Sequence, residues 1–275
     1  MSGSGKRGAR KAAKKQPAKR PAAAPASDTA RIRIVVLMRR LCDGPHQVSE
    51  EEVLGKCERA ALTAALTLRG ELAGHVTALA VGPASREDRV LAMALRAGCD
   101  QAVRVHHPQL EDLDYLGYAT VLAAAVRHLG FDVVICGNRS QDELLGATGP
   151  AMAGVLGVPH LTNLVDVRGE NGSLICVRRA QGAVHEYRCA MPLVACVAAV
   201  PAARRPSEGD LATTRAGGIT ELGMAQVALD PRTLQYRKRF VGQARASRTG
   251  ANATLVASPS DLVAHLERDH LLGRP

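Results

Sequence analysis

The residues best suited to binding chemistry lie in a Gly-rich polar loop between positions 137 and 149. An apolar run with β-branched residues, 131–136, precedes the loop and predicts a strand buried on both faces. Polar side chains follow at the carboxyl end of this strand, where open α/β sheets bind ligands. They are Asn138, Arg139, Ser140, Gln141 and Asp142. A helix is expected to start near Thr148 and Pro150, and its first N–H groups favour an anion, so a nucleotide phosphate is the expected ligand.

Two features of this loop have more than one interpretation. Gly146 and Gly149 are expected to allow close approach of the backbone. Glycines and polar residues also occur in structural βα turns, so the loop by itself is equally typical of a simple connection. Asp142 is expected either to accept a hydrogen bond from a ribose or to cap the loop without touching a ligand.

Other kinds of site have little support in the sequence. The seven cysteines form no C-x-x-C pair, which argues against zinc, an iron–sulfur cluster or a thiol redox pair. They are expected to be small buried hydrophobic residues. His106 and His107 are adjacent rather than four residues apart, so we interpret them as loop residues. A catalytic triad, a pair of catalytic carboxylates and a P-loop are not visible, and we therefore expect a binding protein without catalytic residues of its own.

Alternating strands and helices are expected to position this loop. Short strands are predicted at 32–38, 75–81, 102–105 and 132–136, and helices at 50–69, 88–97, 113–129 and after Gly149. This alternation with short connections predicts an α/β fold of Rossmann type, with a parallel sheet flanked by helices.

The pattern changes after Pro159. Segments 161–168 and 174–179 read as a hairpin, 185–189 as a further strand, and 193–200 as another apolar run, which predicts an antiparallel extension. The chain is weakly patterned from 206 to 257, as in an arm that needs a partner surface to become ordered.

A final amphipathic helix is predicted at 261–272, with Ser258 or Ser260 as its cap. We therefore divide the chain into a basic tail (1–31), an α/β domain (32–205) and a C-terminal arm that packs on a partner (206–275).

Composition is that of an ordinary globular protein, with 46% hydrophobic and 23% charged residues. The formal charge of +10 comes mainly from the tail, where eight Lys and Arg residues precede the first acid, Asp28. The tail is expected to be disordered and solubilising, and to bind nucleic acid only nonspecifically, because it has no aromatic residues for base stacking. We predict no membrane insertion and a cytoplasmic location, since no apolar run approaches the roughly 20 residues of a spanning helix and the amino terminus has no apolar signal segment.

Seven segments in a shared order resemble one known family. They are Val35 to Arg40, Val81-Gly82-Pro83, Met93 to Asp100, the loop 137–150, Leu156 to Pro159 with Thr162, Ala190 to Val194, and Ser260 to Val263. Taken together, the chain resembles the β subunit of electron transfer flavoproteins, which include the FixA proteins.

This resemblance implies a fold like that of the adenine nucleotide alpha-hydrolases and a heterodimer with an α subunit. It also implies FAD shared with that subunit, AMP or a second FAD in the β subunit, and electron transfer between dehydrogenases and an acceptor such as a quinone oxidoreductase. Such a protein is an electron carrier rather than an enzyme. By correspondence, the cofactor-binding residues would be Leu37, Leu54, Gly55, Lys56, Cys57, Val81, Gly137, Asn138, Arg139, Ser140, Gln141, Asp142, Gly146, Ala147, Thr148 and Gly149.

Some segments depart from the family pattern and support a second hypothesis. Leu54-Gly55 replaces the Asn-Pro of the family, and Ala203 to Ser207 replaces the segment that docks dehydrogenases. The alternative is a non-redox regulatory or scaffold protein that binds a nucleotide and is tethered to an anionic partner by its basic tail. An adenylate-forming or hydrolysing enzyme ranks last, because no P-loop is present.

Overall fold

The computed structural model describes residues 31–39, 54–110, 113–140, 144–198 and 218–230, Arg232, Leu234, Val256 and residues 258–268. Most of the predicted basic tail and the segment 203–207 lie outside these residues. The chain divides into two units between Lys238 and Arg239. Within the described ranges, no helix has both the length and the apolar character needed to span a membrane.

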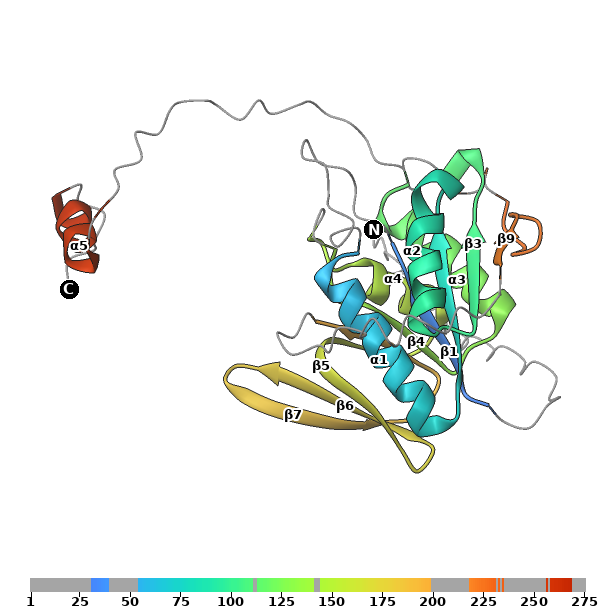
Figure 1. The fold of residues 1–275 in the computed structure, drawn as a ribbon, viewed down its shortest axis with the longest axis horizontal. Coiled ribbons are helices and arrows are strands. Elements are labelled where there is room, and N and C mark those ends of the chain that lie inside the picture. The colour runs from blue at the N-terminus through green and yellow to red at the C-terminus, as the bar shows by residue number, and fades with distance from the viewer. Residues whose placement is uncertain are drawn as a thin grey trace, which may run out of the picture. The chain divides into compact units, whose positions relative to one another are not determined.

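The described part of the first unit forms a nine-stranded sheet in the order β7-β6-β5-β8-β4-β1-β2-β3-β9 (Figure 1). Neighbouring strands from β5 to β9 in this order are parallel, whereas β6 pairs antiparallel with β5 on one side and with β7 on the other. The strands are β1 (Arg33–Leu37), β2 (His75–Val81), β3 (Gln101–Val105), β4 (Val133–Gly137), β5 (His160–Glu170), β6 (Ser173–Ala180), β7 (Ala183–Cys189), β8 (Leu193–Val197) and β9 (Ile219–Leu222).

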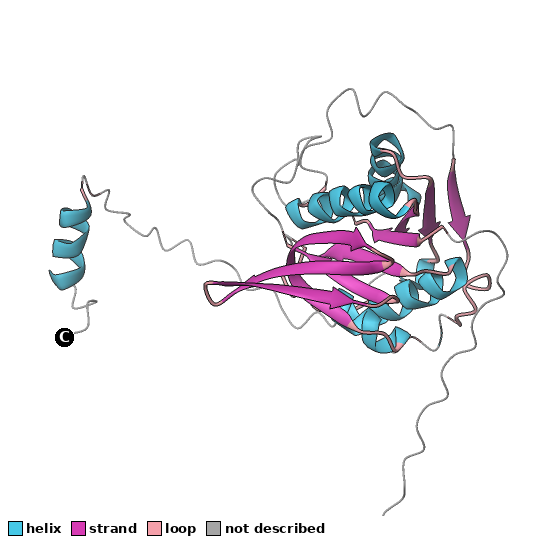
Figure 2. Ribbon diagram, turned by 90° about the horizontal axis from the view of Figure 1, so that it is seen from below, coloured by secondary structure: helices cyan, strands magenta, loops and turns pink. Residues whose placement is uncertain are grey.

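Helices cover both faces of the sheet, as Figure 2 shows. The helices of this unit are α1 (Lys56–Leu72), α2 (Ala84–Ala97), α3 (Tyr115–Leu129) and α4 (Thr148–Leu156), with a short 3-10 turn at Pro108–Leu110. Ile34 and Val36 of β1 pack in the core with α1 and α2, whereas Val35 and Leu37 pack in the core with α3 and α4. Successive side chains of a strand point to opposite faces, so a nearly continuous apolar run is what this two-sided core requires.

The strand order reverses direction beside β1. The connections through α1 and α2 lead from β1 to β2 and on to β3, whereas the connection through α3 returns to place β4 on the other side of β1. The connection after β1 therefore leads to α1 on one face of the sheet, and the connection after β4 leads to α4 on the other face. Such a point leaves a crevice at the carboxyl ends of the two strands, where α/β proteins bind ligands.

The predicted α/β fold with a mostly parallel sheet is confirmed, and differences are confined to details. Helix α2 starts at Ala84, four residues before the predicted start. The apolar run 193–200 was predicted as part of the antiparallel extension. In the structure it forms β8, which lies between β5 and β4 in the parallel part of the sheet.

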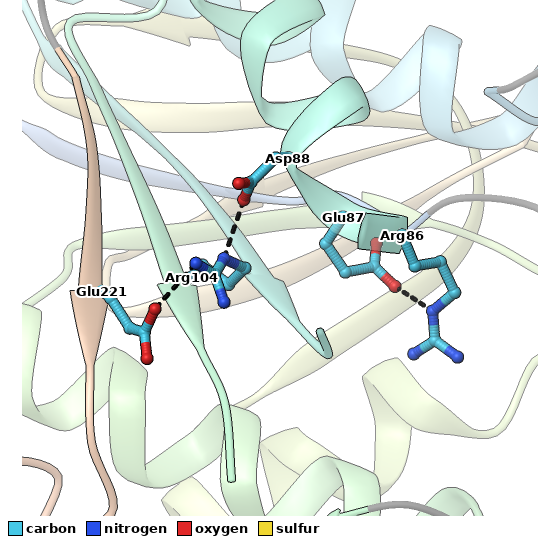
Figure 3. Close-up of polar contacts among 5 residues, drawn as sticks. All are labelled: Arg86, Glu87, Asp88, Arg104 and Glu221. Carbon is cyan, nitrogen blue, oxygen red and sulfur yellow. Dashed lines mark hydrogen bonds and ion pairs between the residues drawn. The ribbon is translucent and has the colours of Figure 1, made fainter. Parts of the chain in front are cut away.

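Residues 219–222 were predicted to belong to the C-terminal arm, and the structure corrects this prediction. They form β9, which pairs in parallel with β3, and Met224 and Val227 are buried with the α3 side of the core. Arg104 of β3 joins the edge strand to the body, since its guanidinium lies 2.7 Å from a carboxylate oxygen of Asp88 and 2.7 Å from one of Glu221 (Figure 3). The division into tail, domain and arm otherwise stays a prediction.

The described part of the second unit contains α5 (Pro259–Arg268). Ser258 caps this helix: its Oγ accepts a hydrogen bond from the Asp261 N–H at 3.2 Å and donates one to the Asp261 carboxylate at 2.8 Å. Pro259 occupies the first helical position, which tolerates proline because its N–H would have no partner there. Of the two predicted caps, the structure selects Ser258.

Candidate functional site

A hollow of about 610 Å³, partly open to solvent, lies at the carboxyl ends of β1 and β4. This is the place where the strand order reverses. Its walls come from the end of β1 (Leu37, Met38, Arg39), from α1 (Glu58), from α3 (Tyr118, Leu122), from the end of β4 and the loop after it (Cys136, Gly137, Asn138, Arg139, Ser140), and from the start of α4 and the residues before it (Leu145, Gly146, Thr148, Gly149).

The first part of the β4–α4 loop is held by Asn138. Its N–H donates to the Val197 carbonyl of β8 at 2.7 Å, and its side-chain Oδ1 accepts from the N–H of Asn163 in β5 at 2.7 Å. One residue therefore joins the end of β4 to two neighbouring strands. The loop starts from a fixed position, and the Asn138 side-chain oxygen has a role within the fold.

The two glycines expected to allow close approach both contact the chain itself. At Gly149, a Cβ atom would lie 2.5 Å from the Cys196 Sγ and 2.9 Å from the Cys136 Sγ, so the first turn of α4 packs directly on the sheet. Gly146 has a φ of +62°, and a Cβ there would lie 2.9 Å from the Asn138 carbonyl oxygen. Packing and backbone conformation therefore account for both glycines.

The start of α4 differs from that of α3. Asp114 caps α3, with its Oδ1 accepting from the N–H groups of Leu116 at 3.0 Å and Gly117 at 2.9 Å. The capping position of α4 is occupied by Ala147, which makes no side-chain hydrogen bond to the first turn. An uncapped helix start that lines a hollow favours a negatively charged group.

Tyr118 and Arg39 form a second wall. The Tyr118 hydroxyl donates to the Val81 carbonyl at 3.1 Å, and the Arg39 guanidinium carbon lies 5.8 Å from the centre of the Tyr118 ring. Burial and the nearby Glu87 carboxylate raise the pKa of Tyr118 well above its ordinary value. The phenol therefore stays a neutral hydrogen-bond donor, and the positive charge on this wall comes from arginine.

The floor of the hollow contains the Cys136 thiol, which has a second thiol beside it. Cys136 of β4 and Cys196 of β8 are paired in register, and their Sγ atoms are 3.5 Å apart. The hydrogen bond that the Cys136 thiol donates to the Cys196 sulfur raises the pKa of Cys136 well above its ordinary value, and burial raises it further. The Cys136 thiol therefore remains protonated, and both buried cysteines pack as small apolar residues, as the sequence predicted.

Eight of the predicted site residues line the hollow: Leu37, Gly137, Asn138, Arg139, Ser140, Gly146, Thr148 and Gly149. Six others do not line the hollow, namely Leu54, Gly55, Lys56, Cys57, Val81 and Ala147. Val81 holds Tyr118 through its carbonyl, and Ala147 precedes α4. Gln141 and Asp142 lie outside the described residues. The assignment of these residues to a cofactor stays a prediction.

Seven residues of the wall were not predicted from the sequence: Met38, Arg39, Glu58, Tyr118, Leu122, Cys136 and Leu145. A signal existed for some of them. Met38 and Arg39 directly follow the first strand, and Tyr118 and Leu122 are four residues apart, which places them on one face of α3. Helices that follow parallel strands start at the carboxyl edge of the sheet, so the first turns of α1 and α3 were places to search.

Comparison with known proteins identifies related chains. The model of the electron transfer flavoprotein domain matches residues 47–225. The electron transfer flavoprotein subunit beta of Mycobacterium tuberculosis is 29% identical over 202 residues, covering 70% of this chain and 76% of the relative. The Bacillus subtilis protein of the same name is 23% identical over 242 residues, covering 84% of this chain and 94% of the relative. Protein FixA of Azorhizobium caulinodans is 35% identical over 161 residues, covering 54% of this chain and 56% of the relative.

Proposed function

Because the chain belongs to the electron transfer flavoprotein family, we propose that it is the β subunit of a heterodimeric electron carrier and binds an adenine nucleotide in the hollow between β1 and β4. The role of the family is electron transfer rather than catalysis by residues of the chain.

The uncapped start of α4 is the observation that carries the nucleotide proposal. Thr148 and Gly149 line the hollow there, and the exposed Arg139 adds a positive charge to the same wall. Backbone N–H groups at a helix start, together with a hydroxyl and a guanidinium, are suited to phosphate. Leu37, Leu122 and the protonated Cys136 supply an apolar floor suited to a base. The residues present therefore fit AMP or the adenylate half of FAD.

The FAD shared with the α subunit is proposed to lie between the two subunits. FAD bound there supplies the reversible electron exchange on which the family depends. Leu144 and Leu145, which are 58% and 64% exposed, project beside the hollow. A partner subunit that covers these two side chains would remove apolar surface from water and exclude solvent from the cofactor.

The redox partners are proposed from the family alone. Dehydrogenases as donors and a quinone oxidoreductase as acceptor remain proposals, because the segment 203–207, where the family docks dehydrogenases, lies outside the described residues. The cytoplasmic location likewise stays a prediction.

The decisive experiment is to produce the chain together with its candidate α subunit and identify the bound cofactors. Heat releases the ligands, chromatography identifies them, and the visible spectrum measures flavin. One FAD and one AMP per heterodimer is the expected result, and two FAD would place the second flavin in the hollow. A complex without flavin or nucleotide would refute the carrier proposal, and nucleotide without flavin would favour the regulatory alternative.

A further inference from the structure

A buried carboxylate lies in the same hollow as the proposed phosphate site. Glu58 is the third residue of α1, its exposed fraction is 7%, and it lines the hollow. Its charge reaches the floor, where it is one of the causes that raise the pKa of Cys136. A carboxylate in a site for an anionic ligand requires an explanation, because like charges repel at short distance.

The helix arrangement separates the two charges. Helix α4 packs on one face of the sheet and α1 on the other, so Glu58 enters the hollow from the side opposite the α4 start. A ligand that places its phosphate at Thr148 and Gly149 can present neutral hydrogen-bond donors to Glu58. A nucleotide has two kinds of such donor, namely the ribose hydroxyls and the exocyclic amine of adenine.

The position of α1 selects between these donors. The first turn of α1 lies against the beginning of the proposed phosphate loop, since a Cβ on Gly137 would be 3.1 Å from the Glu58 backbone nitrogen. In a nucleotide, the ribose is the group bonded to the phosphate, and the base lies farther away. With its backbone beside the start of the loop, Glu58 lies nearer to the sugar than to the base of a ligand whose phosphate is bound by this loop.

We propose that Glu58 makes the hollow selective for ribonucleotides by accepting a hydrogen bond from a ribose hydroxyl. This inference rests on the proposed adenine nucleotide site and adds a specificity-determining residue to it. The chemistry is that by which acidic residues bind the ribose in dinucleotide-binding folds, although here the residue comes from the start of a helix.

The test compares nucleotide selectivity in the full chain. Calorimetry measures the affinity of the nucleotide-free protein for AMP, 2′-deoxyAMP, 3′-deoxyAMP and inosine monophosphate. Because a hydrogen bond to a charged group contributes more than a neutral one, we expect AMP to bind roughly tenfold or more tightly than at least one deoxy analogue. In Glu58→Gln this preference should fall to about threefold or less, since the carboxylate charge is gone.

Glu71→Gln is the matched control. Glu71 lies on the same helix about 20 Å away by helix rise, and its Oε2 accepts from the Gly169 N–H at 2.7 Å. This variant removes a carboxylate from α1 without touching the hollow, so its preference for AMP over the deoxy analogues should equal that of the unmodified chain. A general loss of stability would weaken the binding of all four nucleotides alike and leave the ratios of their affinities unchanged.

Several results would overturn the inference. Equal binding of AMP and both deoxy analogues by the unmodified chain would exclude ribose recognition. If Glu58→Gln still discriminated fully between AMP and the deoxy analogues, Glu58 would have no role in ribose recognition. If the variant instead lost its discrimination against inosine monophosphate, Glu58 would bind the exocyclic amine of adenine. Failure of the unmodified chain to bind any of the nucleotides would refute the proposed nucleotide site and this inference together, whereas the first three results would leave that site intact.

Discussion

A methyl group at Gly149 should disturb the floor of the hollow more than the same group elsewhere on α4. The added Cβ would lie 2.5 Å from the Cys196 Sγ and 2.9 Å from the Cys136 Sγ, so the first turn of α4 would have to move off the sheet. At Gly154 of the same helix a Cβ meets nothing within 4 Å. The two Gly→Ala substitutions therefore form a matched pair on one helix.

The expected magnitude follows from two effects. Replacing glycine by alanine within a helix stabilises it by about 0.5–1 kcal/mol, and this gain applies to both variants. Overpacking a core costs about 1–3 kcal/mol and applies only to Gly149→Ala. Gly154→Ala should therefore raise the free energy of unfolding, and Gly149→Ala should lie about 1–3 kcal/mol below it.

Urea denaturation of the full chain measures both differences, and a double-mutant cycle identifies their cause. Cys196→Ala removes the nearer sulfur, so combining it with Gly149→Ala should recover part of the loss. Equal stability of Gly149→Ala and Gly154→Ala would refute the close packing of α4 on the two thiols. A loss that Cys196→Ala does not reduce would show that another contact is responsible.

Three further predictions concern the fold around the site. Arg104→Met should lower the free energy of unfolding by about 1–3 kcal/mol, and hydrogen exchange should show loss of protection mainly in β9; a uniform loss along the sheet would contradict the role of Arg104 as the link to that strand. Asp114→Ala should cost about 1 kcal/mol by removing the cap of α3, whereas Asp114→Asn should cost much less because an amide oxygen also caps; equal losses in urea denaturation would exclude capping. Burial raises the pKa of Cys99 from 9.0 to about 12, so above pH 9 the unfolded chain loses this proton while the folded chain keeps it. Stability should therefore fall by about 1 kcal/mol per pH unit between pH 9 and 12, and Cys99→Ala should show a shallower fall in denaturation curves over that range; an unchanged slope would contradict the assignment.

The strands and helices of the α/β unit were predictable because their signals are local. Side-chain periods of two and 3.6 residues identify strands and helices within windows of a few residues, and the alternation of the two specifies a parallel sheet. The polar loop after β4 was found for the same reason, because it directly follows an apolar strand. Its position at the hollow follows from a rule about the carboxyl ends of parallel strands and needs no coordinates.

Other features depended on contacts between distant parts of the chain. Glu58 and Tyr118 lie on different helices far from the loop in sequence, and they share a wall with it because β1 and β4 are neighbours in the sheet. The weak pattern around β9 did not reveal that Glu221 meets Arg104, 117 residues earlier.

The class of fold and the polar loop that lines the hollow were predictable from the sequence, since both depend on the order and period of neighbouring residues. The packing that explains the glycines of the loop, and the charges around the loop, are seen only in the folded chain. Gly149 looked like a residue that lets a ligand approach, yet its space is limited by the thiols of Cys136 and Cys196 on two strands. The physical reason is that strand order and register place side chains against one another, and a local pattern contains neither.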